Sequence, residues 1–123
     1  MGLNATGLNQ MLDALDETPA APAAGIGYLS LHTDVVGSGS TGEVTGGSPA
    51  YARKAVTWNA AAAGSKAISG TAVFDVPSGT TIRRVGLFSA VTGGTYFGDA
   101  EITDETYGGQ GTYTVTAATI SVT

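Results

Sequence analysis

The central part of the chain alternates between apolar runs and turn residues, which predicts antiparallel β-strands. Three β-rich runs cover residues 73–76, 81–90 and 95–102. Pro-Ser-Gly at residues 77–79 separates the first two runs, and Gly-Gly at residues 93–94 separates the last two. Proline presets φ and glycine permits positive φ, as tight turns require. The pattern is typical of a β-meander, in which each strand pairs with the next.

Further strands are predicted on both sides of this region. Residues 26–32 and residues 66–76 have the alternation of extended segments, with Gly70 marking a bulge in the second. The last strand is predicted over residues 111–123. Its apolar set changes parity near residues 117–118, which indicates a bulge or bend, because one inserted residue moves the following side chains to the other face.

The segment over residues 51–58 is predicted to be an amphipathic strand. Ala52, Val56 and Trp58 share one face, which we expect to be the core face. Tyr51 and Arg53 then lie on the opposite face. Trp58 is the only tryptophan of the chain, and we expect it to be a core residue.

The N-terminal segment has helical rather than strand periodicity. Residues 4–15 predict a short helix, and residues 18–25 form a linker rich in proline and alanine. Residues 36–48 and 103–110 are predicted to be a loop and a turn. The apolar stripe of the helix must pack on the domain or on a neighbouring subunit, and it consists of Leu8, Met11, Leu12 and Leu15.

Together these segments predict a mainly β fold, an antiparallel β-sandwich or jelly-roll-like domain with a short N-terminal helix. Residues 1–25 form an arm, made of the helix and its linker, and residues 26–123 form the β-sandwich domain. A chain of 123 residues fits one domain with a modest core.

Composition narrows the function classes. The chain has 19 glycines, no cysteine, 12% charged residues and a net charge of −5. Five basic residues are too few for the clustered basic face of a nucleic-acid binder. No apolar run is long enough to span a bilayer, and no signal peptide is visible, so we expect neither membrane insertion nor secretion by a leader. Low charge and many turns favour surfaces that face other proteins.

Candidate catalytic and metal-binding residues are few, and each has a simpler structural interpretation. His32 is the only histidine, and no nucleophile motif accompanies it. A cluster of four acidic residues comprises Asp99, Glu101, Asp104 and Glu105. It lacks the spacing of a calcium loop, so we interpret it as a solvated strand face. The sequence therefore predicts no catalytic residue, no metal and no cofactor.

Three arginines and several tyrosines are candidates for contacts with partners. Arg83 and Arg84 are adjacent in a strand and must point to opposite faces. We expect them and Arg53 to form inter-subunit salt bridges, with the acidic cluster as partner. Candidates for stacking on a host glycan are Tyr51, Tyr96 and Tyr107, although core packing of these rings is the favoured interpretation.

Three stretches resemble a family of small bacteriophage virion proteins: GGSPAYARKAVTW, VFDVPSGTTIRRVGLFSAVTGGTYFGDA and DETYGGQGTYTVT. Proteins of this family are labelled minor tail, tail-fibre or head-decoration proteins of tailed phages, notably phages of actinobacteria. The resemblance covers roughly residues 26–123 and carries no catalytic residues. It implies a virion location after synthesis in the host cytoplasm, and a homo-oligomer, often a trimer.

These observations predict a non-enzymatic structural protein of a phage particle, exposed on tail or capsid. It would act by oligomeric docking onto neighbouring virion proteins, through burial of apolar area. The alternative is a host-surface glycan-binding module of a tail fibre. A glycan-degrading enzyme ranks below both, because no motif supports it.

Overall fold

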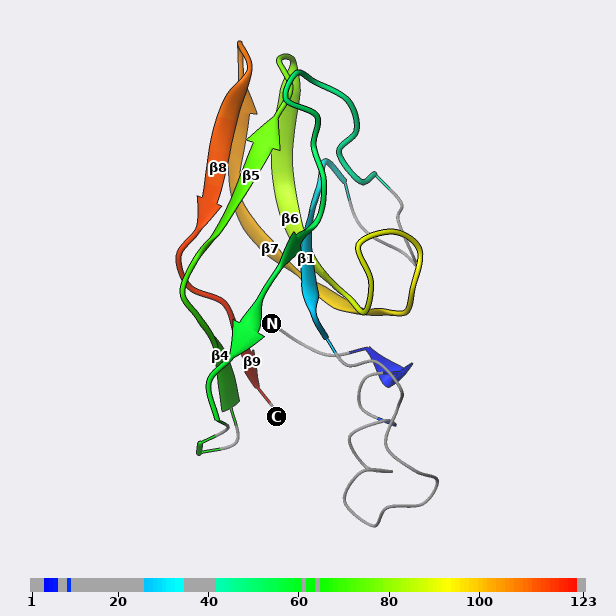
Figure 1. Ribbon diagram of the computed structural model, residues 1–123, viewed down its shortest axis with the longest axis vertical. Coiled ribbons are helices and arrows are strands. Elements are labelled where there is room, and N and C mark those ends of the chain that lie inside the picture. Colours follow the sequence, from blue (N-terminus) through cyan, green and yellow to red (C-terminus); the bar gives the residue numbers. More distant parts are fainter. Residues whose placement is uncertain are drawn as a thin grey trace.

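The computed structural model describes residues 4–6, 9, 26–34, 42–60, 62–63 and 65–121 (Figure 1). In these residues nine strands form, and every strand pairing is antiparallel. The strands are β1 (Tyr28–His32), β2 (Lys54–Ala55), β3 (Thr57–Trp58), β4 (Ser65–Ser69), β5 (Ala72–Val76), β6 (Thr80–Phe88), β7 (Tyr96–Tyr107), β8 (Gly111–Val115) and β9 (Thr119–Ser121).

The prediction of a mainly β, antiparallel fold is confirmed. One sheet has the order β2-β1-β6-β7, a second has the order β3-β4-β9, and β5 pairs with β8 alone. In Figure 1, β5 and β8 lie in front of β6 and β7, and β4 and β9 lie below them. The finer topology, a sandwich or a jelly roll, stays a prediction.

The predicted meander is only half right. β6 and β7 form the expected hairpin, but β5 pairs with β8 and not with β6. The turn at residues 77–79 instead carries the chain from one group of strands to the other, with Gly79 at φ +76°. Alternation showed that one face of β5 is buried, but alternation does not say which strand lies at its edge.

Three other boundaries differ from the predictions. Gly70, at φ +84°, is not a bulge within one strand but the break between β4 and β5, which lie in different sheets. Residues 51–58 contain two two-residue strands in different sheets instead of one strand. β7 continues to Tyr107, because residues 105–107 still pair with the start of β6; this shortens the predicted turn at residues 103–110.

The C-terminal segment behaves as its change of parity predicted. The strand is interrupted after Val115 and resumes at Thr119, and both Val115 and Ala118 are buried. The Ile68 N–H donates to the Ala118 carbonyl at 3.0 Å, so the pairing of β9 with β4 begins one residue before Thr119.

The predicted helix over residues 4–15 and linker over residues 18–25 lie almost entirely outside the described residues, so the helix is not confirmed. Of this segment, Asn4 contacts the β-domain. Its backbone N–H donates to the Phe97 carbonyl at 2.7 Å, and its side-chain amide donates to the Tyr96 carbonyl at 2.8 Å. Most of the predicted loop at residues 36–48 also lies outside the described residues.

The main core lies between the two groups of strands. Each strand contributes alternate side chains, as burial of one face requires. The four-stranded sheet supplies aliphatic residues from β1 and β6 together with Phe97 of β7, and the facing strands supply Phe74 from β5 and apolar residues from β4 and β8. The fully or almost fully buried members are Leu29, Leu31, Phe74, Val76, Ile82, Val85, Leu87 and Phe97.

The predicted faces of residues 51–58 need correction. Arg53 is buried and Ala52 is exposed, the reverse of the expected order in this half of the segment. Trp58 is only half-buried, packs at the margin of the core, and donates its indole N–H to the Ile26 carbonyl at 2.7 Å. Two short strands in different sheets replace one continuous strand, so the alternation of faces does not carry through the segment.

Gly86 marks a close approach on the other face of the four-stranded sheet. It pairs with Ser30 in β1, whose hydroxyl lies 2.6 Å from His32 Nε2, and both of these side chains are fully buried. A methyl group at Gly86 would lie 2.5 Å from Ser30 Oγ and 2.8 Å from His32 Nε2. A side chain at this position therefore has to displace two buried polar groups.

We expect Gly86→Ala to lower the free energy of unfolding by about 1–3 kcal/mol, the usual cost of inserting atoms into a packed site. Chemical denaturation of the purified protein measures the change. Gly108→Ala is the matched control, because a methyl group there meets no atom within 4 Å. Equal stability of Gly86→Ala and the wild type would contradict the packing described here.

Candidate functional site

Residues 42–44 extend the four-stranded sheet along the edge of β1 that β2 leaves uncovered. The Thr33 N–H donates to the Gly42 carbonyl at 2.8 Å, and the Val44 N–H donates to the Leu31 carbonyl at 3.0 Å. This pairing places Glu43 opposite His32 and holds its carboxylate at the sheet margin. Nothing in the local sequence, which is rich in glycine, serine and threonine, indicated a fixed carboxylate here.

Glu43 and Arg53 form a bidentate ion pair in this position. Arg53 Nε donates to Glu43 Oε2 and Arg53 Nη2 donates to Glu43 Oε1, both at 2.9 Å. The Arg53 side chain is only 5% exposed and that of Glu43 is 12% exposed. Two parallel charge-assisted bonds fix both distance and orientation, and removal of either partner leaves a charge in a poorly solvated place.

The remaining contacts of Arg53 tie this pair to the β6–β7 connection. Its Nη1 donates to the Ala90 carbonyl at 3.0 Å and to the Gly93 carbonyl at 2.8 Å. The guanidinium carbon lies 3.6 Å from the centroid of the Phe88 ring, a cation–π contact. One side chain thus holds the segment after β1 and the β6–β7 connection together.

Tyr51 joins the ion pair to the main core. Its hydroxyl donates to Glu43 Oε2 at 2.8 Å and accepts from the Leu31 N–H at 3.0 Å. Its ring stacks on Phe74, with centroids 6.2 Å apart and planes 13° apart. Burial and the neighbouring Glu43 charge raise the pKa of Tyr51 well above its usual value, so the hydroxyl remains a donor.

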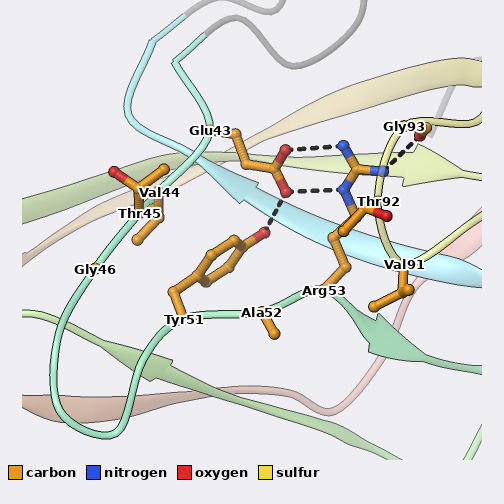
Figure 2. A pocket seen from close by; sticks show the side chains of 10 residues that line it. All are labelled: Glu43, Val44, Thr45, Gly46, Tyr51, Ala52, Arg53, Val91, Thr92 and Gly93. Atoms are coloured by element: carbon orange, nitrogen blue, oxygen red, sulfur yellow. Dashed lines mark hydrogen bonds and ion pairs between the residues drawn. The ribbon is translucent and has the colours of Figure 1, made fainter.

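A shallow groove of about 380 Å³ lies over this cluster (Figure 2). Glu43 and Tyr51 lie on one side of it and residues 91–93 on the other, with Arg53 bridging the two. Since Arg53 and Glu43 neutralise each other within the chain, the groove offers a ligand no net charge. In the described residues no three histidine or acidic side chains are grouped closely enough to hold a metal ion.

The other predicted contact arginines also have carboxylate partners in their own chain. Arg83 Nη1 lies 2.6 Å from Asp104 Oδ2, with both side chains about half exposed. Arg84 contacts Asp99 at 3.0 Å and, more weakly, Glu101 at 3.7 Å. The acidic cluster therefore has the arginine partners that the sequence suggested, within one chain. Inter-subunit salt bridges stay a prediction.

The three tyrosines proposed for glycan stacking are all engaged in packing. Tyr51 contacts Phe74, as described. Tyr96 packs on Phe88 with ring centroids 5.5 Å apart and donates its hydroxyl to Asp99 at 2.7 Å. Tyr107 is half-buried, and its hydroxyl donates to the Thr112 carbonyl at 2.7 Å. The predicted apolar stripe at residues 8–15 lies outside the described residues.

His32 is a buried structural residue in the described chain. It lies 2.6 Å from Ser30 Oγ, and its ring stacks on Phe88 with centroids 6.2 Å apart. Neither side chain of this serine–histidine pair is accessible to a substrate, because both are fully buried.

In the part of the chain that the structure describes, no helix is long and apolar enough to cross a membrane.

A family model described as "Podophage GP4 fiber I protein gp80" matches residues 2–123, almost the whole chain. No curated protein matches the sequence. The family match confirms the resemblance to phage virion proteins. It does not address the narrower link to phages of actinobacteria.

We expect Arg53→Ala to destabilise the protein by about 3–5 kcal/mol, because it leaves the Glu43 carboxylate without its counter-ion and two carbonyls without their donor. Tyr51→Phe, which removes the hydrogen bond to the Glu43 carboxylate and the one from the Leu31 N–H, should cost about 1–3 kcal/mol. Urea denaturation gives both values. Arg83→Ala is the matched control, since its exposed ion pair should contribute about 1 kcal/mol or less. Similar losses for Arg53→Ala and Arg83→Ala would contradict a stabilising role of the buried cluster.

The stability should also depend on pH through Glu43. Burial alone raises the pKa of Glu43, but the hydrogen bonds from Arg53 and Tyr51 and the Arg53 charge outweigh it and bring the pKa below the ordinary 4.5. Because the pKa of Glu43 is lower in the folded than in the unfolded state, its ionisation stabilises the fold fully at a pH above the pKa of the unfolded state. This stabilisation is lost as the pH falls through the pKa of the folded state. We expect Glu43→Gln to remove this part of the acid destabilisation, measured by denaturation midpoints across that range. An unchanged acid slope in the variant would show that Glu43 is not responsible.

Proposed function

We propose that this chain serves as a non-enzymatic structural subunit of the phage particle. The family model matches residues 2–123, nearly the whole chain, so the chain belongs to the family of the podophage GP4 fiber I protein gp80. Membership makes it a structural protein of a phage virion. The proposal adds that it is exposed on the tail or capsid and acts by docking onto neighbouring virion proteins. The single observation that carries the proposal is the match over residues 2–123.

The geometry of the candidate site supports a structural role. Glu43, Tyr51 and Arg53 direct their polar groups to one another and to backbone atoms. Such a cluster fixes the positions of two chain segments, which suits a protein that must present a constant surface to its neighbours. The proposed mechanism is burial of surface between rigid β-domains, and no step of it needs a nucleophile, a metal or a cofactor.

We further propose that the working form is a homo-oligomer, with a trimer as the expected number. Charged residues make up only 12% of the chain, which limits repulsion between copies. Open strand edges favour association, because a neighbour can satisfy their backbone groups. Arg83, with its half-exposed ion pair, is the most accessible of the three arginines predicted to contact a neighbour.

The N-terminal arm, residues 1–25, has a proposed role in holding the subunit in place. Asn4 is hydrogen-bonded to the start of β7, so the chain just after the N-terminus is attached to the domain at this point. The apolar stripe of the predicted helix would then contact either the domain or an adjacent virion protein. The division at residue 25 and the family's narrower association with phages of actinobacteria stay predictions.

The alternative of a host-glycan module has no specific observation in its favour. Tyr51 and Tyr96 direct their hydroxyls to carboxylates of the same chain, and Tyr107 directs its hydroxyl to a carbonyl. Stacking of a sugar on these rings would compete with existing packing. We therefore retain the structural role.

A particle-incorporation experiment tests the proposed function. Particles assembled without this protein are incubated with equal amounts of the full chain and a variant that lacks residues 1–25. We expect both to remain folded and only the full chain to occupy the particle at high level, because the arm adds contact area. Quantitative mass spectrometry of the purified particles measures the ratio. Absence of both proteins from the particle would contradict the virion role, and equal occupancy would contradict the role of the arm.

A further inference from the structure

Two long strand edges of the β-domain have little or no partner among the described residues. β7 is the outermost strand of the four-stranded sheet, and it has 12 residues. β8 is at the edge of its pair with β5, and β9 is at the edge of the β3-β4-β9 sheet. β8 and β9 follow one another over residues 111–121, and β8 forms the left margin of the molecule in Figure 1.

The two edges are close in sequence, yet they do not pair within the chain. Residues 108–110 connect β7 to β8, but β8 pairs with β5 in the other group of strands. The Tyr107 ring lies against Gly111, where an added methyl would come within 2.9 Å of the ring, and the Tyr107 hydroxyl donates to the Thr112 carbonyl. The two strands then separate, and neither has a further strand on its outer side among the residues that the structure describes.

The outer edge of β7 already accepts a backbone hydrogen bond. The Asn4 N–H donates to the Phe97 carbonyl at 2.7 Å, from a segment that is not part of the sheet. This contact covers only the first residues of the strand. The later part of β7, from residue 99 onward, pairs on one side with β6 and has no strand on its other side among the described residues. Unpaired edge groups of this kind are a template for another strand.

The charges on the two edges differ sharply. β7 carries Asp99, Glu101, Asp104 and Glu105, and among the described residues only Arg83 and Arg84 of β6 are paired with them, so this side of the sheet keeps an excess of negative charge. Residues 111–121 carry no charged side chain. Two β7 strands from different copies would bring two acidic strands together, and like charges opposite one another destabilise cross-strand pairs. An uncharged, threonine-rich strand meets no such repulsion. The best partner for the β7 edge within this sequence is therefore the β8–β9 edge.

We propose that β7 of one copy pairs, edge to edge, with the β8–β9 segment of a second copy of this chain. The inference rests on the proposed function in that it specifies the surface by which the oligomer forms. Each copy offers one edge of each kind, so the contact is head-to-tail and can close into a ring. Main-chain hydrogen bonds hold the strands together, as in other cases of strand addition.

The main competing arrangement pairs the β8–β9 segment of one chain with the β8–β9 segment of another, since no charge opposes it. In that arrangement the longer β7 edge of every subunit gains no strand partner. The head-to-tail arrangement covers both edges of each copy. The experiment must therefore distinguish pairing between unlike edges from pairing between like edges.

Engineered disulfides make this distinction, because the chain has no native cysteine. Thr103→Cys and Asp104→Cys each place a thiol on β7, and as successive residues they sample both faces of the strand. Thr112→Cys, Thr114→Cys and Thr116→Cys each place one at an exposed position of the segment over residues 111–121. Strands in register bring Cα atoms about 4.5–5.5 Å apart, within the range of a disulfide.

Each variant is oxidised alone and in a mixture of one β7 variant with one variant of residues 111–121, with one partner labelled by ¹⁵N. Thr92→Cys, exposed but outside both edges, is the control for random collision. We expect at least one mixture to form a cross-linked dimer that contains both chains, at several times the yield of the control. Light scattering of the unmodified protein records the oligomeric state in parallel.

The outcomes separate the inference from the proposed function. Cross-links between unlike variants support the pairing. Cross-links only within one variant indicate like-with-like pairing and overturn the inference. Oligomers by light scattering without any specific cross-link also overturn it, while the proposed oligomer stands. A monomer at every concentration, both in solution and on particles, removes both claims.

Discussion

The buried pair of Arg53 and Glu43 is the interaction on which the surroundings of β1 depend. Among the described residues, β1 would be flanked only by β6 and the two residues of β2 without the segment that carries Glu43. Arg53 draws that segment to the sheet and, through the Ala90 and Gly93 carbonyls, draws in the β6–β7 connection as well. A desolvated ion pair contributes little net free energy compared with apolar packing. Its value here is geometric, because bidentate and backbone bonds define one arrangement of segments that have few apolar side chains of their own.

Phe88 shows how this polar cluster is supported by the sheet. The ring lies on the face opposite the main core, is 2% exposed, and contacts Arg53, His32 and Tyr96. The four-stranded sheet is therefore packed on both faces near this residue. That double packing explains why Ser30 and His32, polar residues of a strand, are as deeply buried as the leucines between them and beside them.

Much of the strand content was predictable, since alternation and turn residues mark β1, β5, β6 and β8 directly. Pairing was less predictable, because the turn at residues 77–79 carries the chain from the sheet of β5 to the sheet of β6 instead of folding β6 back onto β5. The candidate site was the least predictable part. Glu43 lies in a glycine- and serine-rich segment without periodicity. Arg53 was expected on the face away from the core, and alternation gave no sign that it would be buried there by its four polar contacts and Phe88. The placement of Arg83 and Arg84 was easier to predict, since the side chains of adjacent residues in a strand point to opposite faces.

The places where the chain enters β1 and completes β9 have a mechanical consequence. Ile26, just before β1, and Ile120 of β9 line one groove, separate from the groove over Arg53, together with Trp58 and Lys66, so these two places lie close together. A force that pulls these two points apart would act perpendicular to the strands and break their hydrogen bonds one after another. A load applied between these two points and the turns at residues 77–79 and 108–110 would act along the strands and strain many bonds at once. The domain therefore has a weak and a strong direction, and the way it is attached decides which one resists force.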